Sequence, residues 1–263
     1  MEGSSGVGTT PVWPLSPAEE HLLDAAETLA AAIEAGLEAQ KDVPLQGVEE
    51  ASLIATFHAV RALRCLRSVT ITCRAGYAVE AAAIVRSLLE DAVSLRYLSL
   101  KPKSRVRKWL RFDETRSLEY WRLSERLGLG LLKSEHIRRL EAEPRAASNP
   151  VWWSGKNPSA MAREIKTVDP DLHKTFKALY PWLSDVTHAN VKTTSSYYFA
   201  DEGNEPTLRV EPSNHLLHLM IDLTAGVCVR VCLLAQDLDM KIDIGPMAVA
   251  KTAFDERSAN LGG

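Results

Sequence analysis

The 263 residues exceed a typical ~150-residue domain but fit one large domain with a tail. Hydrophobic residues at 46% and charged residues at 25% are ordinary values for a globular protein, which excludes a wholly disordered chain. Aromatic residues reach only 6%, and Ala, Leu and Val supply most of the apolar content, which favours helices over a sheet sandwich. A net charge of −3 excludes a global attraction to nucleic acid or to an acidic membrane.

The N-terminal sequence lacks the basic and apolar regions of a signal peptide, and no apolar run approaches the ~20 residues that span a bilayer. The most apolar segment, 216–235, is interrupted by His218, Asp222 and Arg230, so it predicts a core helix. The four cysteines form no Cys-x-x-Cys pair, and we expect buried, unpaired thiols rather than zinc ligands or disulfides at Cys65, Cys73, Cys228 and Cys232. These features predict a cytoplasmic protein that does not bind membranes.

In chain order, residues 1–15 are expected to form a disordered tail. Ser16 and Glu19 predict a capping box for a helix that runs to about Glu38. Gly76 separates the next two helices, while Ser104 and Ser213 are expected to cap later ones. Apolar residues at helical spacing predict these further helices at 48–74, 77–100, 104–126, 134–142, 159–166, 170–180 and 213–239. Pro181 is expected to start a new turn or to kink the chain.

The segments 193–199 and 207–211 are β-prone, and turn-forming residues lie between them, which predicts a small hairpin. Residues 241–263 show no periodicity and are expected to form a C-terminal tail. Repeats and an alternating strand–helix pattern are both missing, which argues against a parallel α/β sheet. The predicted fold is all-α: a multi-helix bundle over residues 16–240, with a small β-hairpin insertion near 193–211.

Positive charge is concentrated in residues 101–145, which hold 13 Lys or Arg and 7 Asp or Glu. On a helical wheel, Arg105, Lys108, Arg116 and Arg126 fall on one stripe that also holds Glu119. Basic residues near tryptophans could bind RNA or single-stranded DNA. A solvated helix face beside core aromatics is the favoured interpretation, because a net charge of +6 with seven acids gives a modest field. We therefore expect weak nucleic-acid binding at most.

Arg86 and Glu90 lie four residues apart at the edge of an apolar helix face. A surface pair would more often place the acid first, because that order suits the helix dipole. A half-buried Arg and Glu need hydrogen-bond partners from another element or from a ligand. Either the pair fixes helix register inside the bundle, or Arg86 holds an anion while Glu90 acts as a base or orients a partner.

The segment 180–190 places Ser184 and His188 four residues apart, with Asp185 between them. The Gly-x-Ser-x-Gly elbow of serine hydrolases is missing, so a hydrolase is not favoured. Instead, His188 is predicted to form a hydrogen bond with the Arg86 and Glu90 pair, from a different helix, and to serve as a proton carrier.

The segment 151–160 contains Trp152, Trp153, Gly155 and Lys156 just before a helix, which is a plausible anion contact but not a Walker A motif. Aromatic residues that anchor a loop to the bundle are the favoured alternative. We expect this loop to close over the Arg86 cluster. On the last helix, His215, His218 and Asp222 share a stripe, but the spacing of a di-iron site is missing, so no metal and no cofactor are predicted.

Three segments, 76–98, 152–156 and 180–190, together resemble a widespread bacterial family of unknown function, DUF5677. The resemblance covers roughly residues 50–235 and rests on Arg86 with Glu90, on Trp152 or Trp153 with Gly155 and Lys156, and on Ser184 with His188. Pro181 and the Ala-Asn pair after His188 depart from the family pattern. The resemblance implies an all-helical fold and leaves the reaction open.

The sequence leaves three functions open. In the first, Arg86 and Lys156 bind an anionic small molecule or a phosphodiester, Glu90 and His188 form the acid/base pair, and Trp153, Gly155 and Ser184 line the site. In the second, the protein is a non-enzymatic interaction module or a homo-oligomer. The third, a helical ribonuclease, would need an Arg and a His on one helix, and Arg209 with His215 is a poor match because Pro212 separates them.

Overall fold

The computed structural model describes residues 14–38, 49–129, 135–142, 152–188, 190, 199–202, 205–208 and 213–259. Helices dominate these residues, which confirms the predicted all-α class. The helices are α1 (Pro17–Glu38), α2 (Glu50–Arg74), α3 (Ala82–Ser99), α4 (Pro102–Arg126), α5 (Glu135–Ala142), α6 (Pro158–Ile165), α7 (Pro170–Thr187), α9 (Leu217–Gln236) and α10 (Gly245–Ala259).

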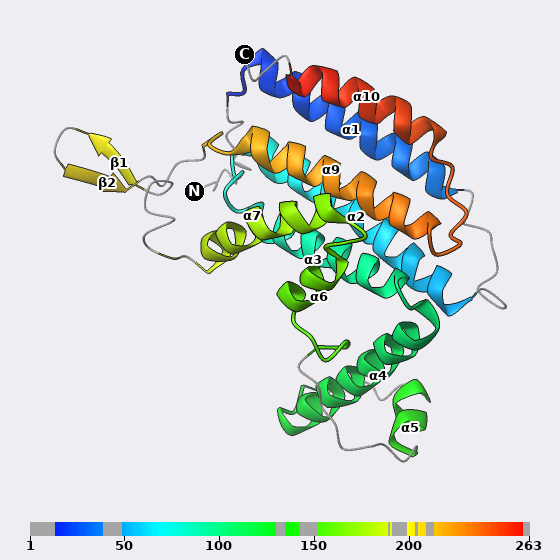
Figure 1. Cartoon of the computed structure of the whole chain (residues 1–263). Helices are drawn as coiled ribbons and strands as arrows, with labels where there is room; N and C mark the ends of the chain where they lie inside the picture. The colour runs from blue at the N-terminus through cyan, green and yellow to red at the C-terminus, as the bar shows by residue number, and fades with distance from the viewer. Residues whose placement is uncertain are drawn as a thin grey trace, which may run out of the picture.

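Helix α9 lies at the centre of the bundle, where it packs against α1, α2, α3 and α10 (Figure 1). By length and composition alone α9 could cross a membrane, but most of it is buried among these neighbours, as predicted for a core helix. Its Cys228 and Cys232 are buried and form no disulfide, and the same holds for Cys73 on α2, whereas Cys65 forms no disulfide but is only half-buried. Burial raises the pKa of the Cys73 thiol to about 12, so this side chain behaves as a small apolar group.

Helix α3 has neighbours on several sides, because α2, α9, α7 and α6 all pack against it. Leu88, Leu89, Ala92 and Leu95 are completely buried and supply its apolar contacts. Helix α7 runs antiparallel to α3 along the opposite side from α1 and α10 (Figure 1). The polar residues of α3 therefore face α7 on one side and α2 on the other.

The helix starts agree with the sequence only in part. The Ser16 and Glu19 capping box is confirmed: Glu19 N–H donates to Ser16 Oγ at 3.2 Å, and Ser16 N–H donates to Glu19 Oε2 at 2.7 Å. The expectation for Ser104 was wrong, because α4 starts earlier, with Pro102 in its first turn. Ser213 does not cap α9 either; its N–H donates to the Gly76 carbonyl at 2.7 Å, and α9 begins after Leu216.

The C-terminal tail expected over 241–263 was also wrong, because 245–259 form α10, which packs along α1. Met247, Ala250 and Phe254 are buried there. Their three- and four-residue spacing is that of a helix face, so the signal was present in the sequence. Helix α7 continues through Pro181 to Thr187. Pro181 is exposed, so water can satisfy the carbonyl that loses its helical donor.

Two short strands, β1 (Phe199–Glu202) and β2 (Glu205–Leu208), pair antiparallel, with Phe199 opposite Leu208. They occupy much of the 200–206 segment expected to be a turn. The β-prone residues 193–198 and 209–211 lie outside the described residues, as does most of the expected N-terminal tail.

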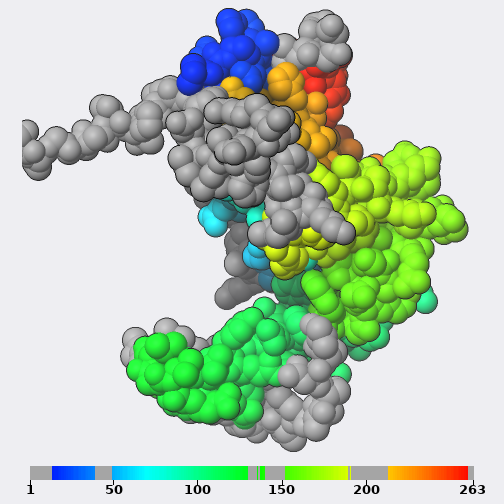
Figure 2. Space-filling view, turned by 90° about the vertical axis from the view of Figure 1, so that its left-hand side faces the viewer, coloured from blue at the N-terminus to red at the C-terminus, as the bar shows by residue number. Residues whose placement is uncertain are grey.

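Helices α4 and α5 leave the bundle as an arm (Figures 1 and 2). The arm has a small core of its own, in which Leu118 and Trp121 of α4 are buried with Ile137 of α5. Near the bundle, Val106 of α4 joins the main core. The first turns of α4 are thus anchored, whereas its C-terminal half is supported mainly by α5.

Candidate functional site

The predicted ion pair forms the centre of a polar cluster between α3 and α7. Arg86 Nη2 lies 3.2 Å from Glu90 Oε1, one helical turn along α3. Tyr180 on α7 bridges the pair: its hydroxyl donates to Glu90 Oε1 at 2.6 Å and accepts from Arg86 Nη2 at 3.1 Å. We name Arg86, Glu90 and Tyr180 the α3–α7 cluster. Tyr180 is the partner from another helix that a half-buried Arg and Glu require.

Packing fixes the Tyr180 ring in this position. The ring stacks on Phe176, one turn earlier on α7, with centroids 4.3 Å apart. The Arg86 guanidinium lies 5.2 Å from the ring centroid, within cation–π range. Burial, followed by the hydrogen bond to Glu90, raises the pKa of the Tyr180 hydroxyl, which therefore stays protonated and acts as a donor.

One donor of the cluster has no acceptor among the residues that the structure describes. Arg86 Nε is buried from solvent and has no hydrogen-bond partner there. Arg86 and Glu90 side chains as a whole are 24% and 19% exposed, so the cluster lies at the edge of the core and remains reachable. A buried N–H without an acceptor costs ~1–3 kcal/mol, and an oxygen atom from outside the described residues would remove that cost.

His188 does not join this cluster, so the expected contact from His188 was wrong. It is exposed at the C-terminal end of α7, and its backbone N–H donates to the Ser184 carbonyl. Eight residues separate it from Tyr180, which is about 12 Å along a helix. Ser184 is half-buried on the same helix, and no side-chain contact joins it to Arg86 or Glu90 among the described residues.

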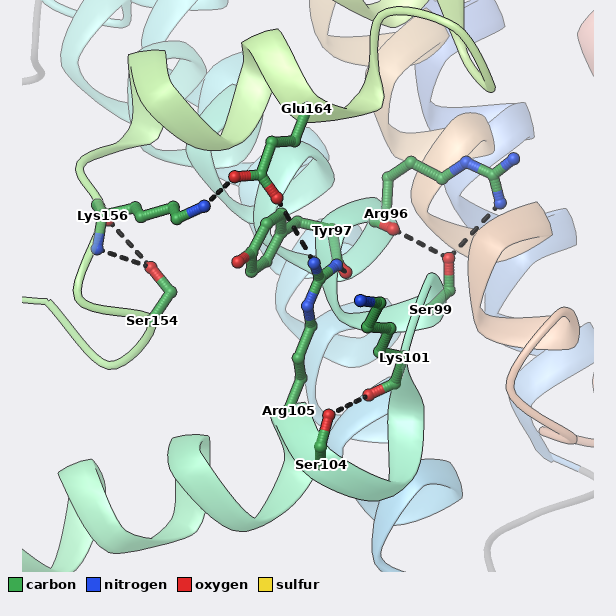
Figure 3. A network of polar contacts seen from close by, with 9 residues as sticks. All are labelled: Arg96, Tyr97, Ser99, Lys101, Ser104, Arg105, Ser154, Lys156 and Glu164. Atoms are coloured by element: carbon green, nitrogen blue, oxygen red, sulfur yellow. Dashed lines mark hydrogen bonds and ion pairs between the residues drawn. The ribbon is translucent and has the colours of Figure 1, made fainter.

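The 152–156 loop closes over a different part of α3 (Figure 3). Trp153 is buried, with its ring edge-to-face on Tyr97 at 5.7 Å between centroids. Tyr97 lies seven residues beyond Glu90, which is about 10 Å along the helix. The expectation that this loop covers the Arg86 cluster was therefore wrong, and the loop anchors by its aromatic side chain, as the alternative interpretation had it.

Gly155 gives the loop its turn and Lys156 ties it to α6. Gly155 has φ +71°, and its N–H donates to the Trp152 carbonyl at 2.8 Å. The ammonium group of Lys156 pairs with Glu164 of α6 (Figure 3). Glu164 also pairs with Arg105 of α4 at 3.4 Å. Lys156 is therefore a structural link here and is not close to Arg86.

Arg105 anchors α4 to this network. Its guanidinium lies 3.4 Å from the centroid of the Tyr97 ring and donates to the Tyr97 carbonyl (Figure 3). The residue is only 9% exposed. Arg105 therefore does not belong to the exposed basic stripe expected from the sequence, and it holds the base of the arm against α3 and α6.

Residues 52–206 match a family described as a family of unknown function, DUF5677. The match covers more than half of the chain. The chain belongs to this family. Among curated proteins and solved structures, none matches the chain significantly. The DUF5677 segment includes the whole α3–α7 cluster, the 152–156 loop and His188, whereas α1, α9 and α10 lie outside it.

A second polar cluster of this DUF5677 chain, which the sequence did not predict, lies between α2 and α3. Arg61 donates through Nε to Asp91 Oδ2 at 2.5 Å and through Nη2 to Ser87 at 2.5 Å. His58 Nδ1 lies 3.6 Å from Asp91 Oδ1. We name His58, Arg61, Ser87 and Asp91 the α2–α3 cluster. The available signal in the sequence was one polar pair at helical spacing on each helix, His58 with Arg61 and Ser87 with Asp91.

Burial shifts both titratable members of the α2–α3 cluster toward their neutral forms. It lowers the pKa of His58 to about 4, with a smaller contribution from Arg61. It raises the pKa of Asp91 to about 6, although Arg61 acts in the opposite direction. Glu90 also interacts electrostatically with Arg61, so the two clusters are neighbours across α3.

The remaining candidates do not form a site. Asp222 on α9 accepts from Ser258 Oγ of α10 at 2.6 Å. His215 and His218 do not complete a metal-binding group with it, and the described part of the chain contains no cluster of three such ligands. Arg209, which the ribonuclease alternative requires, lies outside the described residues.

Proposed function

We propose that this DUF5677 protein binds a small ligand through an anionic oxygen, and that Arg86 holds this oxygen. The observation that carries the proposal is the buried Nε of Arg86, which lacks an acceptor among the described residues while Nη2 of the same group is held by Glu90 and Tyr180. The contacts of Nη2 hold the guanidinium in place, while the Nε donor has no acceptor among the described residues. An incoming acceptor oxygen can therefore bind without reorienting the side chain.

The chemistry of the cluster favours a carboxylate or a phosphate group. Arginine binds both groups with strong charge-assisted hydrogen bonds. Arg61 interacts electrostatically with Glu90 and contributes a second positive charge, which offsets part of the repulsion from Glu90 and Asp91. Because Arg86 and Glu90 are less than one-quarter exposed, only a small part of a ligand can enter.

In this proposal Glu90 and Tyr180 are positioning residues, because they orient the guanidinium. Acid/base chemistry by Glu90 and His188 is not part of it, since His188 lies at the exposed end of α7. Trp153, Gly155 and Lys156 support the fold through Tyr97 and α6. We place the protein in the bacterial cytoplasm, as the sequence led us to expect.

An interaction or oligomerisation module is the second candidate. The observation that favours it is a set of exposed apolar side chains toward the end of α4: Tyr120, Leu123, Leu127 and Leu129. Light scattering coupled to size exclusion measures the oligomeric state. A monomer over a wide concentration range would remove self-association as the role of these side chains.

The test of ligand binding compares Arg86→Ala with Arg64→Ala. Arg64 is an exposed cation on α2, so its loss changes the net charge equally without touching the cluster. Small molecules that co-purify with each protein are identified by mass spectrometry, and melting temperatures are measured with inorganic phosphate and with a panel of carboxylates. We expect retained or stabilising anions with wild type and Arg64→Ala but not with Arg86→Ala. Equal behaviour of all three proteins would refute the proposal.

A further inference from the structure

The first three turns of α4 carry an unusual charge pattern. Residues 101–112 contain six Lys or Arg and no Asp or Glu. Cations near a helix N-terminus oppose the helix dipole and cost stability, so stability alone favours acids there. Arg105 is used internally against Tyr97 and Glu164. The other five are exposed on the surface: Lys101, Lys103, Arg107, Lys108 and Arg111.

The five exposed cations, which we name the α4 basic face, have no ion pair or side-chain hydrogen bond among the described residues. Some other surface arginines do have such partners. Arg67 forms two hydrogen bonds to Glu34, and Arg74 bonds to both Asp24 and Glu27. The α4 basic face therefore keeps its full charge for an external partner.

The positions of these cations form one continuous surface. At 100° per residue, four of them and Ser104 fall within about one-third of the helix circumference, with Lys103 at its edge. From Lys101 to Arg111 the face is about 15 Å long. About four phosphates of one nucleic-acid strand, spaced 3.4 Å apart, would cover that length. Large apolar side chains are missing from the exposed positions of residues 101–112.

The charge of the rest of the bundle is arranged to direct a polyanion to this face. Helix α1 contains six acidic residues and no Lys or Arg. It lies on the opposite side of the molecule from α4, which extends away from the bundle (Figure 1). Separation of opposite charges across a molecule steers association with a charged partner, even when the net charge is close to zero.

We infer that the α4 basic face binds the phosphate backbone of a nucleic acid without reading its sequence. Phosphate contacts need cations and hydroxyls only, which is what this face offers. A membrane surface is less suited, because an interfacial helix needs an apolar side that inserts between lipids. An acidic protein is also less suited, because a protein interface has an apolar centre. At most five contacts form, so the affinity is low and depends on salt.

The experiment measures fluorescence anisotropy of a labelled 20-nucleotide RNA and of a 20-base-pair DNA duplex at several salt concentrations. Five contacts limit the log–log salt slope to about −3.5 for single strands and about −4.5 for duplex. We expect binding at 50 mM salt that weakens to Kd ~1–100 µM at physiological salt. The test variant replaces Lys103, Arg107, Lys108 and Arg111 by Gln, and Arg107→Gln with Arg111→Gln serves if the fourfold variant does not fold.

The matched control replaces four exposed cations of the α6–α7 region by Gln, at Arg163, Lys166, Lys174 and Lys177, which gives the same change in net charge. We expect the α4 variant to lose at least tenfold in affinity and to show a shallower salt slope, and the control to bind like wild type. Equal losses in both variants, or no binding to either nucleic acid at 50 mM salt, would overturn the inference. Stronger competition by polyglutamate than by RNA at equal charge would assign the face to an acidic protein instead.

Discussion

The Tyr180 hydroxyl donates to Glu90 Oε1 across 2.6 Å from a neighbouring helix. The Tyr180 hydroxyl oxygen also accepts from Arg86 Nη2, so one hydroxyl on α7 satisfies both members of the ion pair on α3. Since a hydroxyl both donates and accepts, tyrosine can do this without adding a charge. The contact fixes the axial position of α7 on α3 at a place where apolar packing alone would permit sliding.

Replacement of Glu90 by Gln tests the energetic role of this arrangement. Gln keeps the shape and the acceptor for Tyr180, but a half-buried Arg86 loses its counter-charge. We expect the free energy of unfolding to fall by ~1–3 kcal/mol. Urea denaturation of wild type and variant at pH 7 measures the difference.

Two further variants separate the cluster from its surroundings. Tyr180→Phe keeps the stacked ring and removes one donor and one acceptor, so a loss of ~1 kcal/mol is expected. His188→Ala should change stability by less than ~0.5 kcal/mol, because this side chain is exposed. A larger effect of His188→Ala than of Tyr180→Phe would contradict the arrangement described above.

The sequence identified Arg86 and Glu90 because residues four apart on one helix always share a face. It did not identify Tyr180, although Tyr180, Ser184 and His188 lie on one stripe of α7 at comparable spacing. Which of these three faces Glu90 depends on the axial position of two antiparallel helices. That position results from packing of the whole bundle, and no local pattern encodes it.

The α2–α3 cluster was missed for a related reason. His58 and Asp91 are more than 30 residues apart, and the polar pairs at helical spacing on each helix do not show that the two helices bring them together. Helix α10 is a different case, since the spacing of Met247, Ala250 and Phe254 was visible. Gly245, Pro246 and the alanines around that stripe weaken the apolar periodicity, so the sequence predicts a tail there.

The Trp153 contact predicts unequal roles for two adjacent tryptophans. Trp153 is buried against Tyr97, whereas Trp152 is half-buried. Trp153→Ala should lower the free energy of unfolding by ~3–5 kcal/mol, because a large buried ring leaves a cavity. The matched variant Trp152→Ala should cost clearly less. Thermal and urea denaturation compare them, and equal losses would argue against burial of the Trp153 ring.

Two glycines predict opposite outcomes for the same substitution. At Gly36 a methyl group would come within 2.4 Å of the Asp243 carbonyl oxygen, so Gly36→Ala should separate α1 from the start of α10 and cost ~1–3 kcal/mol. At Gly226, inside α9, a methyl group meets nothing within 4 Å. Gly226→Ala should therefore stabilise by ~0.5–1 kcal/mol through helix propensity. Melting temperatures that move in the same direction would contradict this difference.

The α2–α3 cluster predicts a concealed pH dependence of stability. The pKa of Asp91 is raised from 3.8 to about 6 on folding, so between these values the native state holds a proton that the unfolded state has lost. The stability that Asp91 contributes to the folded state is complete below pH 3.8 and is lost as pH rises through 6. The pKa of His58 is lowered from 6.5 to about 4, so its contribution is full above 6.5 and is lost as pH falls through 4.

In wild type these two contributions run in opposite directions over nearly the same pH range. Each shift of about two pKa units corresponds to up to ~3 kcal/mol, so their sum is nearly flat between pH 4 and 6.5. Removal of one group should therefore reveal the other. Asp91→Asn leaves His58, and stability relative to wild type should rise with pH. His58→Gln leaves Asp91, and the same difference should fall with pH.

Urea denaturation of the three proteins at half-unit steps from pH 4.5 to 7 measures both differences. Comparison with wild type at each pH removes the titration of all other groups, since neither substitution touches them. The opposite slopes follow from burial of both side chains, and Asn at position 91 keeps an acceptor for Arg61. Slopes of the same sign in the two variants would show that His58 and Asp91 are not both held neutral by burial in the folded protein.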